Sequence, residues 1–375
     1  MKKICYFINS DWYFELHWLE RAKKAKEQGY EVHIITNFLD DKVWRRFDEN
    51  GFHCHDIKID AQSFSPLNFL STLFLSRKTV NKIKPNVLHC ITIKACLIGG
   101  LIAKANNIPV ILSFVGLGRV FMDGGKSIKC IRKIILSLYR FIVKNKKCTL
   151  MFEHEDDKQK LLSLLKVNGL HTVIINGAGV NPDVYRYSLE NTNVNPVVLF
   201  ASRLLWSKGI GDLVEVKKRL QSKGVIFELK VAGIITADDP DAVPLTTIDE
   251  WNKAGLITWL GHSNNVYELI KDSNIVALPS VYAEGIPRIL LEACSVGRSC
   301  IAYDVGGCHS LIRNNINGVI VPKKDIDNLE CQVEYLINNP KIRMHMGIKG
   351  RQYINEKFTS EIILRDTLAV YQSLM

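Results

Sequence analysis

Short apolar runs alternate along the first half of the chain with longer stretches in which apolar residues recur every three or four positions. The runs predict buried strands, and the longer stretches predict helices that cover them. Strands are predicted at residues 4–8, 31–36, 87–89, 110–114, 149–153 and 172–175, and helices at 16–28, 66–84, 97–105 and 126–147. Regular alternation of strand and helix predicts a doubly wound α/β domain with a parallel sheet. Such sheets bind ligands at the carboxyl ends of their strands.

A second alternating series follows a polar stretch. Asn-Gly-Ala-Gly at 176–179 and the polar residues 187–195 have the composition of an interdomain linker. Strands are then predicted at 196–201, 227–233, 257–260 and 275–278, with helices at 287–297 and from 329 onward. A chain of 375 residues has the length of two ordinary domains. We therefore predict an α/β protein of two doubly wound parallel-sheet domains, at 1–188 and 189–355, and a final helix within 356–375.

The stretch from Pro279 to Gly297 joins the last of these strands to a helix. Pro287 stands just inside the predicted helix start, and Gly297 stands just past its end. Glu284 lies in the turn and Glu292 in the helix, a separation of about 12 Å if the segment is helical. Unpaired N–H groups and the positive end of the helix dipole can hold a diphosphate there, between carboxylates that accept sugar hydroxyls. The alternative is two ordinary glutamates on an amphipathic helix.

The pattern Pro-Ser-x-x-x-Glu-Gly-x-Pro-x-x-Leu-Leu-Glu-Ala at 279–293 resembles the nucleotide-binding core of family 4 glycosyltransferases, retaining enzymes of the GT-B fold. The resemblance implies two domains that face each other across a cleft, with the final helix crossing back onto the first domain. It also implies transfer of a sugar, with retention, from a nucleotide donor such as a UDP-hexose or UDP-N-acetylhexosamine. In the mechanism often proposed for such enzymes, the departing phosphate oxygen takes the proton of the acceptor.

The resemblance assigns donor contacts to three loops of the second half. Glu284 is expected to fix the donor sugar and Glu292 the ribose, with Gly285, Ile286 and Arg288 in the same motif. The pattern Ser-Arg-Leu-x-x-x-Lys-Gly at 202–209 matches the donor-phosphate clamp of the family, in which Arg203 and Lys208 are catalytic together with Glu284. Two cations in one strand-to-helix loop can converge on a phosphate. The loop at Leu260 and His262 is expected beside the nucleobase.

Acceptor-side residues are expected in the first half. Asp11 and His17 follow the first predicted strand, where a plain loop and helix start is the alternative. Family members commonly have glycines in that loop, and this chain has none there. Gly116 and Gly118 follow the strand at 110–114 and permit a close backbone approach, although Gly-x-Gly is more often a tight turn.

No metal and no other cofactor is expected, because the nucleotide-sugar is a substrate. Two Asp-x-Asp triplets were considered as metal ligands, since glycosyltransferases of another fold use that motif. The triplet at 239–241 lies in an acidic loop and the one at 325–327 has the pattern of a helix cap. We interpret both as structural.

The excess of positive charge lies entirely in the first half. Residues 1–188 contain 29 Lys and Arg against 17 Asp and Glu, whereas 189–375 contain 20 against 21. This asymmetry indicates an anionic partner for the first domain alone. In the predicted helix at 126–147, an apolar stripe is flanked by cations and by no acid, at Lys129, Arg132, Lys133, Arg140 and Lys144. The helix is either packed on the core with a solvated basic face or bound to an anionic membrane surface.

These observations predict an enzyme at the inner face of the cell membrane. Scattered cysteines favour reduced thiols in the cytosol, and no spanning segment or signal peptide is predicted. A lipid-linked saccharide acceptor would supply negative charge and lipid, as in bacterial relatives that build O-antigen or capsule. The rival hypotheses are a nucleotide-sugar epimerase or hydrolase of the same fold, and an inactive membrane-associated scaffold. Nucleic acid is not an expected partner, because aromatics are not interleaved with the cations.

Overall fold

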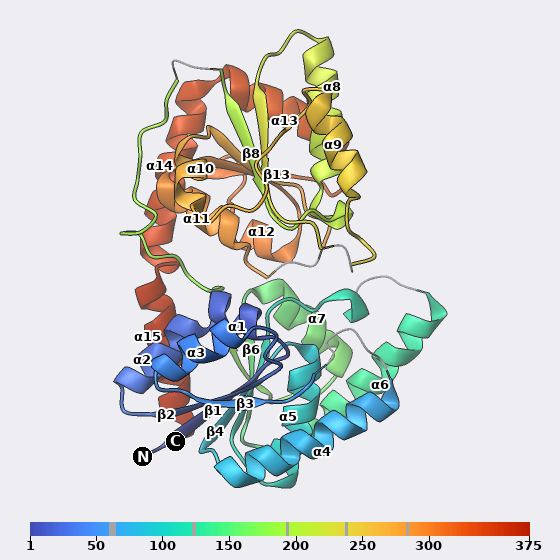
Figure 1. The fold of residues 1–375 in the computed structure, drawn as a ribbon, viewed down its shortest axis with the longest axis vertical. Helices are drawn as coiled ribbons and strands as arrows, with labels where there is room; N and C mark the ends of the chain where they lie inside the picture. The colour runs from blue at the N-terminus through green and yellow to red at the C-terminus, as the bar shows by residue number, and fades with distance from the viewer. Residues whose placement is uncertain (60–64, 122–124, 193–194, 237–238, 283–284) are drawn as a thin grey trace. The chain divides into compact units, whose positions relative to one another are not determined.

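The computed structural model describes residues 1–59, 65–121, 125–192, 195–236, 239–282 and 285–375. It divides into two compact units (Figure 1). The first comprises Met1–Ala178 with Ile363–Met375, and the second comprises Gly179–Ile362. Each unit has a parallel sheet with helices packed on it. The predicted fold class, two doubly wound α/β domains, is therefore confirmed.

The first unit is built on a seven-stranded sheet of order β3-β2-β1-β4-β5-β6-β7. Its strands are β1 (Lys3–Phe7), β2 (Glu31–Thr36), β3 (His53–Asp56), β4 (Val87–Ile91), β5 (Val110–Phe114), β6 (Cys148–Phe152) and β7 (His171–Ile174). Strand β3 was not predicted, because its sequence His-Cys-His-Asp has no apolar run. It is the edge strand beside β2 and therefore needs little apolar surface.

Seven helices cover the two faces of this sheet. They are α1 (Asp11–His17), α2 (Leu19–Glu27), α3 (Asp41–Glu49), α4 (Pro66–Ile83), α5 (Ile93–Ala105), α6 (Lys126–Ile142) and α7 (Glu155–Leu165), in the described residues. The predicted helix at 16–28 corresponds to the end of α1 and to α2, which are separated at Trp18. Helix α4 begins as its sequence indicates, with Ser65 as N-cap and Pro66 in the first position.

The second unit repeats the plan with a six-stranded sheet of order β10-β9-β8-β11-β12-β13. Its strands are β8 (Val197–Ala201), β9 (Glu228–Ala232), β10 (Thr258–Trp259), β11 (Ile275–Leu278), β12 (Ser299–Tyr303) and β13 (Gly318–Val321). The helices are α8 (Ile210–Ser222), α9 (Leu245–Lys253), α10 (Val266–Lys271), α11 (Arg288–Val296), α12 (Gly306–Leu311), α13 (Ile326–Asn338) and α14 (Pro340–Lys357), followed by α15 (Ser360–Leu374). Asp325 caps α13, as the pattern at 325–327 predicts.

The segment 179–188, which the sequence analysis assigned to the first domain, belongs to the second unit. The carbonyl of Tyr185 accepts hydrogen bonds from Ser295 Oγ at 2.8 Å and from Arg351 Nη1 at 2.9 Å. The backbone N–H of Ser188 donates to the carbonyl of Val296. This segment is therefore hydrogen-bonded to α11 and α14 and is part of the second unit rather than a free linker.

A buried hydrogen-bond network attaches α15 to the sheet of the first unit. His89 Nδ1 lies 2.8 Å from the hydroxyl of Tyr371, and His89 Nε2 lies 2.6 Å from Ser113 Oγ. The hydroxyl of Tyr371 in turn donates to that of Tyr6 at 3.0 Å. Burial lowers the pKa of His89 to about 3, so the ring is neutral and can both donate and accept. The network explains why 363–375 group with the first unit.

We expect Tyr371→Phe to destabilise the protein by about 1–3 kcal/mol, because it leaves buried polar partners of Tyr371 unsatisfied. Thermal unfolding of the variant should show a lower Tm than wild type. Tyr335→Phe, at a ring that is 44% exposed, is the matched control and should melt like wild type. Equal Tm values for all three proteins would show that the network does not hold α15.

Candidate functional site

The carboxyl ends of the parallel strands in the second unit bring the predicted donor residues to one edge of the sheet. The loop that follows β8 contains Arg203 and Lys208, and the turn that follows β11 leads into α11. Strands β8 and β11 are neighbours in the sheet, although the paired residues Val198 and Ile275 are 77 positions apart in the sequence. This is the edge at which open α/β sheets bind ligands.

The loop after β8 is fastened directly to the turn after β11. The carbonyl of Ser207 accepts a hydrogen bond from Val281 N at 2.8 Å and one from Ser280 Oγ at 3.3 Å. Gly209 has φ +84°, and a Cβ added to it would lie 2.0 Å from the carbonyl oxygen of Pro279. Only glycine permits this approach, so the Lys208-Gly209 step of the motif has a structural reason.

The two cations of this loop lie in different surroundings. Lys208 is 9% exposed, and its Nζ lies 5.5 Å from the ring centroid of Tyr282. The side chain of Arg203 is 41% exposed, and its Nη1 lies 3.9 Å from Asp239 Oδ2. Lys208 is therefore largely buried at the base of the loop, whereas Arg203 is partly exposed to solvent.

The Asp-x-Asp triplet at 239–241 braces the loop. Asp241 accepts hydrogen bonds from the backbone N–H of Ser207 at 3.1 Å and from the hydroxyl of Ser207. Trp206 N donates to the carbonyl of Asp241 at 2.9 Å. These contacts agree with the structural interpretation of the triplet. Sequence reasoning interpreted the triplet as structural but did not identify Ser207 and Trp206 as the partners of Asp241.

Glu292 lies on the buried side of α11, where it already has partners. Its Oε1 is 3.3 Å from Arg288 Nη2, and its carboxylate is hydrogen-bonded to the hydroxyl of Tyr185. Burial raises the pKa of Glu292, while Arg288 and Tyr185 act in the opposite direction. Burial and the nearby Glu292 carboxylate also raise the pKa of Tyr185. Tyr185 carried no signal in the sequence, because it stands far from the motif, between the two segments interpreted as a linker.

The remaining residues of the motif are placed as follows. Ile286 is buried in the apolar core and Gly285 is partly buried, just before α11. The first turn of α11 contains no Asp or Glu, so no first-turn carboxylate offsets the positive end of the helix dipole. Glu284 lies outside the described residues.

Leu260 and His262 follow β10 and are exposed. The carbonyl of Gly261 accepts a hydrogen bond from Gly233 N at 2.8 Å, and Leu204 N donates to Ile234 O at 3.0 Å. The loops after β10, β9 and β8 are thereby linked in sequence along the same edge.

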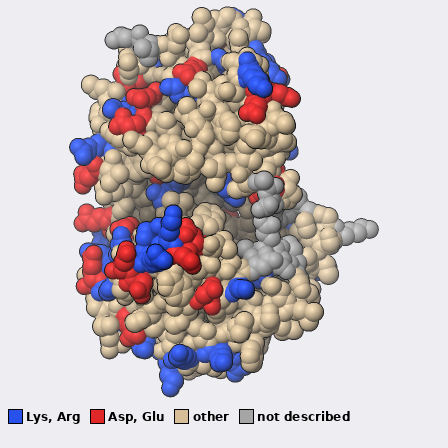
Figure 2. All heavy atoms as spheres, viewed as in Figure 1, with Lys and Arg blue, Asp and Glu red and all other residues tan. Residues whose placement is uncertain are grey.

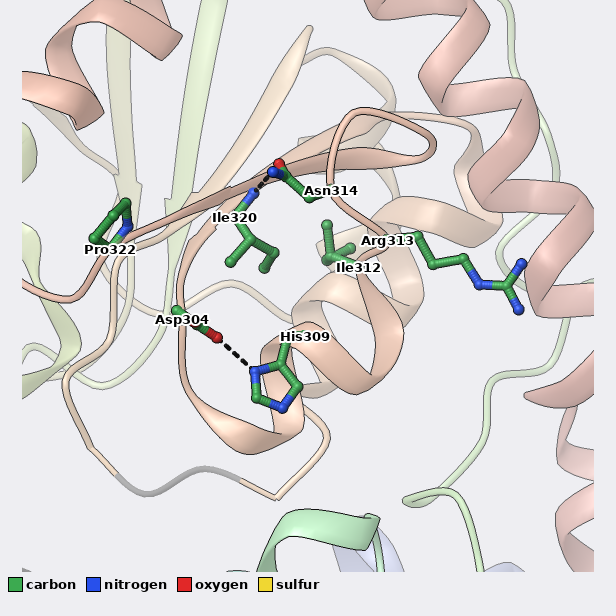
Figure 3. A pocket seen from close by; sticks show the side chains of 7 residues that line it. All are labelled: Asp304, His309, Ile312, Arg313, Asn314, Ile320 and Pro322. Carbon is green, nitrogen blue, oxygen red and sulfur yellow. Dashed lines mark hydrogen bonds and ion pairs between the residues drawn. The ribbon is translucent and has the colours of Figure 1, made fainter.

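A cavity of about 430 Å³ opens at the carboxyl ends of β12 and β13 (Figure 3). His309 Nδ1 lies 2.5 Å from Asp304 Oδ1 at its mouth. Arg313 points away from this pair, and its guanidinium lies 3.9 Å from the ring centroid of Tyr353. Asp304 and His309 line the cavity at the same carboxyl edge of the sheet that carries Arg203 and Lys208. Sequence reasoning did not find this cavity.

The predicted acceptor-side residues lie in the first unit, at the carboxyl edge of its sheet. Asp11 is almost fully buried and accepts backbone hydrogen bonds from Trp12 at 2.7 Å and from Leu39 at 2.8 Å. This carboxylate therefore ties the loop after β1 to the loop after β2. The imidazole of His17 packs on the ring of Tyr13 with centroids 4.4 Å apart. Gly116 and Gly118 have φ of +96° and +63° in the turn after β5.

Two family models match the chain in succession. The model described as glycosyl transferase 4-like matches residues 3–153, and the one described as glycosyl transferases group 1 matches residues 184–353. Between them they span most of both units.

Curated relatives match over most of their length. The N,N'-diacetylbacillosaminyl-diphospho-undecaprenol alpha-1,3-N-acetylgalactosaminyltransferase of Campylobacter jejuni is 24% identical over 364 residues, 94% of each chain. The UDP-Gal:alpha-D-GlcNAc-diphosphoundecaprenol alpha-1,3-galactosyltransferase of Escherichia coli is 24% identical over 81% of this chain and 76% of its own. The solved structure of HepE from Anabaena with UDP-glucose superposes with a TM-score of 0.77 at 14% identity, over 100% of both chains, and shows the shared fold. The chain belongs to the family 4 glycosyltransferases, which have the GT-B fold.

Proposed function

We propose that the protein transfers a hexose or N-acetylhexosamine from a UDP-sugar to a lipid-linked saccharide, with retention, in the synthesis of a bacterial surface polysaccharide such as O-antigen or capsule. The observation that carries this proposal is the loop of Arg203 and Lys208, fastened to the turn that leads into α11. The Campylobacter and Escherichia relatives are named for action on undecaprenol-diphosphate saccharides, and this supports the acceptor class.

The donor diphosphate would be bound by groups that the fold already holds in place. Lys208 is fixed by the contact between Gly209 and Pro279 and lies over Tyr282. Arg203 is near the surface and offers a planar fork for a second phosphate oxygen. Because these groups need little rearrangement on binding, they stabilise developing negative charge more effectively than mobile side chains do.

The reaction has a simple balance of bonds. The bond between C1 of the donor sugar and the diphosphate oxygen breaks, and the acceptor hydroxyl oxygen bonds to C1 on the same face. The hydroxyl proton passes to the departing phosphate oxygen. Arg203, Lys208 and the start of α11 receive the charge, without a metal.

The ribose would bind at Glu292. Because Arg288 and Tyr185 already contact this carboxylate, ribose hydroxyls must share or replace those contacts. The two partners keep Glu292 oriented before the donor arrives, and orientation of this kind lowers the entropic cost of binding.

A surface of the first unit supplies a route to lipid. Leu67, Leu70 and Phe74 lie on one face of α4 and are 79%, 58% and 70% exposed. Exposed Arg77 and Lys78 follow on the next turn, and α4 contains no acidic residue. Lys and Arg side chains gather at the lower rim of the molecule in Figure 2, toward the C-terminal end of α4. Exposed apolar side chains beside cations are the composition of a helix that lies on an anionic membrane.

Helix α6 contributes less than its sequence suggests. Ile135 and Ile142 of its apolar stripe are buried in the core. Arg140 donates hydrogen bonds to the carbonyls of Leu164 and Leu165, and Arg132 donates to that of Val120. Among the described residues of the helix, Lys129 and Lys133 are exposed, as are Ile134 and Phe141, and exposed Lys144 follows the end of the helix. Both α4 and α6 pack on α5, and no helix in the described residues is long and apolar enough to cross a bilayer. We propose peripheral binding to the inner face of the cell membrane through both helices.

We expect Glu284→Gln nearly to abolish transfer while the protein stays folded. The sequence places Glu284 in a turn outside the core, and loss of a charge-assisted hydrogen bond to the donor costs about 1.5–3 kcal/mol. Initial rates with a UDP-sugar and a lipid-diphosphate saccharide measure this. Glu250→Gln, at an exposed position on α9, is the control with wild-type rates. Wild-type kinetics for Glu284→Gln would remove this residue from the site.

Arg203→Ala and Lys208→Ala should each lower turnover by a factor of about 10² or more. Losses of this size are typical when an enzyme loses a hydrogen-bond donor that stabilises the charge developing in the transition state. Lys218→Ala, at an exposed position on α8, should leave turnover unchanged.

Transfer should persist in excess EDTA. Dependence on Mg²⁺ or Mn²⁺, restored on adding the ion back, would contradict the metal-free mechanism. Full conversion of the donor without acceptor would instead favour an epimerase or hydrolase.

Binding to liposomes with anionic lipid should fall when α4 or α6 is altered. We expect weaker cosedimentation for the triple change of Leu67, Leu70 and Phe74 to Ser, and for Lys129, Lys133 and Lys144 to Gln. Only the binding that depends on the lysines should weaken strongly with salt, since screening acts over about 8 Å at physiological ionic strength. Ile226→Ser, at an exposed apolar site of the second unit, is the control. Wild-type binding by both triple variants would exclude this surface.

A further inference from the structure

We propose that Glu31, His33 and His53 form a binding site for a zinc-class divalent cation at the amino-terminal edge of the first sheet. Glu31 and His53 are the first residues of β2 and β3, and His33 stands two positions after Glu31. In the register of the two parallel strands, His33 pairs with His53. Alternate residues of a strand share one face, so the three side chains project to the same side.

The ligand atoms of the three residues are already grouped as a cation requires. One atom from each residue lies within 4.8 Å of the others, and in the described residues this is the sole such group of His, Cys, Asp and Glu. Glu31 Oε1 is 2.9 Å from His33 Nε2 and 3.8 Å from His53 Nε2. Tetrahedral zinc with bonds of about 2.0–2.2 Å sets its ligands about 3.4 Å apart. The separations of 2.9 Å and 3.8 Å bracket that value.

A fourth residue supports the site from behind. His33 Nδ1 lies 3.1 Å from His55 Nε2, and the two rings are stacked with centroids 5.4 Å apart. With a cation on Nε2, His33 keeps its proton on Nδ1 and donates it to His55. Metal-bound imidazoles typically donate their second N–H in this way, which fixes the tautomer and the ring orientation.

The chemistry of the donor atoms also suits a cation. A ligand set of two imidazoles and a carboxylate, completed by water, is suited to Zn²⁺.

One lysine opposes cation binding and provides a direct test. Lys3 Nζ lies 3.3 Å from Glu31 Oε1, where it competes directly with a cation. The side chain of Lys3 is 33% exposed, so it can move into solvent when a cation binds. Removal of this competitor should tighten binding.

The site would pin the edge strand β3 to β2, at the end of the sheet opposite to the carboxyl edge. The proposal of this cation site does not depend on any step of the proposed sugar transfer. A bound cation should therefore change stability without taking part in sugar transfer.

The test is calorimetric titration of the tag-free full chain with ZnCl₂ after removal of metals by EDTA and dialysis. We expect one equivalent of Zn²⁺ to bind, a higher Tm with Zn²⁺ than without, and reversal by EDTA. His53→Ala, at a side chain that is 59% exposed, should fold normally and weaken binding at least tenfold. His55→Ala should weaken it about 10–100-fold. Lys3→Gln should bind more tightly than wild type, and His345→Ala, at an exposed histidine of α14, should match wild type.

Three outcomes would overturn the proposal. They are no saturable binding of one equivalent by wild type, equal binding by His53→Ala and wild type, and equal losses in His53→Ala and His345→Ala. Titration of His33→Gln, which keeps a polar side chain of similar size, separates loss of a ligand from loss of the fold. Its melting without metal should resemble that of metal-free wild type.

Discussion

The contact between Gly209 and the carbonyl of Pro279 is the constraint on which the candidate site depends. A Cβ at position 209 would lie 2.0 Å from that oxygen, and the residue has φ +84°. The absence of a side chain allows two loops from neighbouring strands to be hydrogen-bonded through Ser207 and Val281. Lys208 is consequently fixed beside Tyr282, at the edge where the helix α11 begins. The sheet brings the strands together, and this glycine brings their loops together.

The charge of the molecule is used in two ways in the first unit. Some cations complete the fold, as Arg140 does by donating to the carbonyls that end α7. Others, such as Lys129 and Lys133, are exposed and add to the positive potential of the surface. A net charge summed over a sequence does not separate these two groups, because internal hydrogen bonding depends on tertiary contacts. The proposed membrane surface therefore rests on the exposed apolar residues of α4 as much as on charge.

Much of the fold could be predicted because the strands of a doubly wound sheet are buried and read as apolar runs. The strands at 197–201 and 275–278, and the loops that follow them, were located by that signal. Strand β3 could not be found, because an edge strand with polar residues has no such pattern. Tyr185 and Asp241 were missed as partners of the site because their contacts join segments far apart in the chain. Asp11 was considered for the acceptor, but the structure shows its carboxylate engaged by backbone N–H groups, a role that a sequence pattern does not reveal.

The central claim is that the loop of Lys208 and the turn before α11 bind a nucleotide-sugar. The most direct test is the thermal stability of the protein in a panel of nucleotides and nucleotide-sugars, with Lys208→Met and the exposed-site variant Lys218→Met beside wild type. A ligand at 100 times its Kd stabilises a protein by about 2.7 kcal/mol. We expect UDP and at least one UDP-sugar to raise the Tm of wild type and Lys218→Met, and to have little effect on Lys208→Met. Equal protection of all three proteins, or no protection of wild type by any nucleotide, would contradict the account.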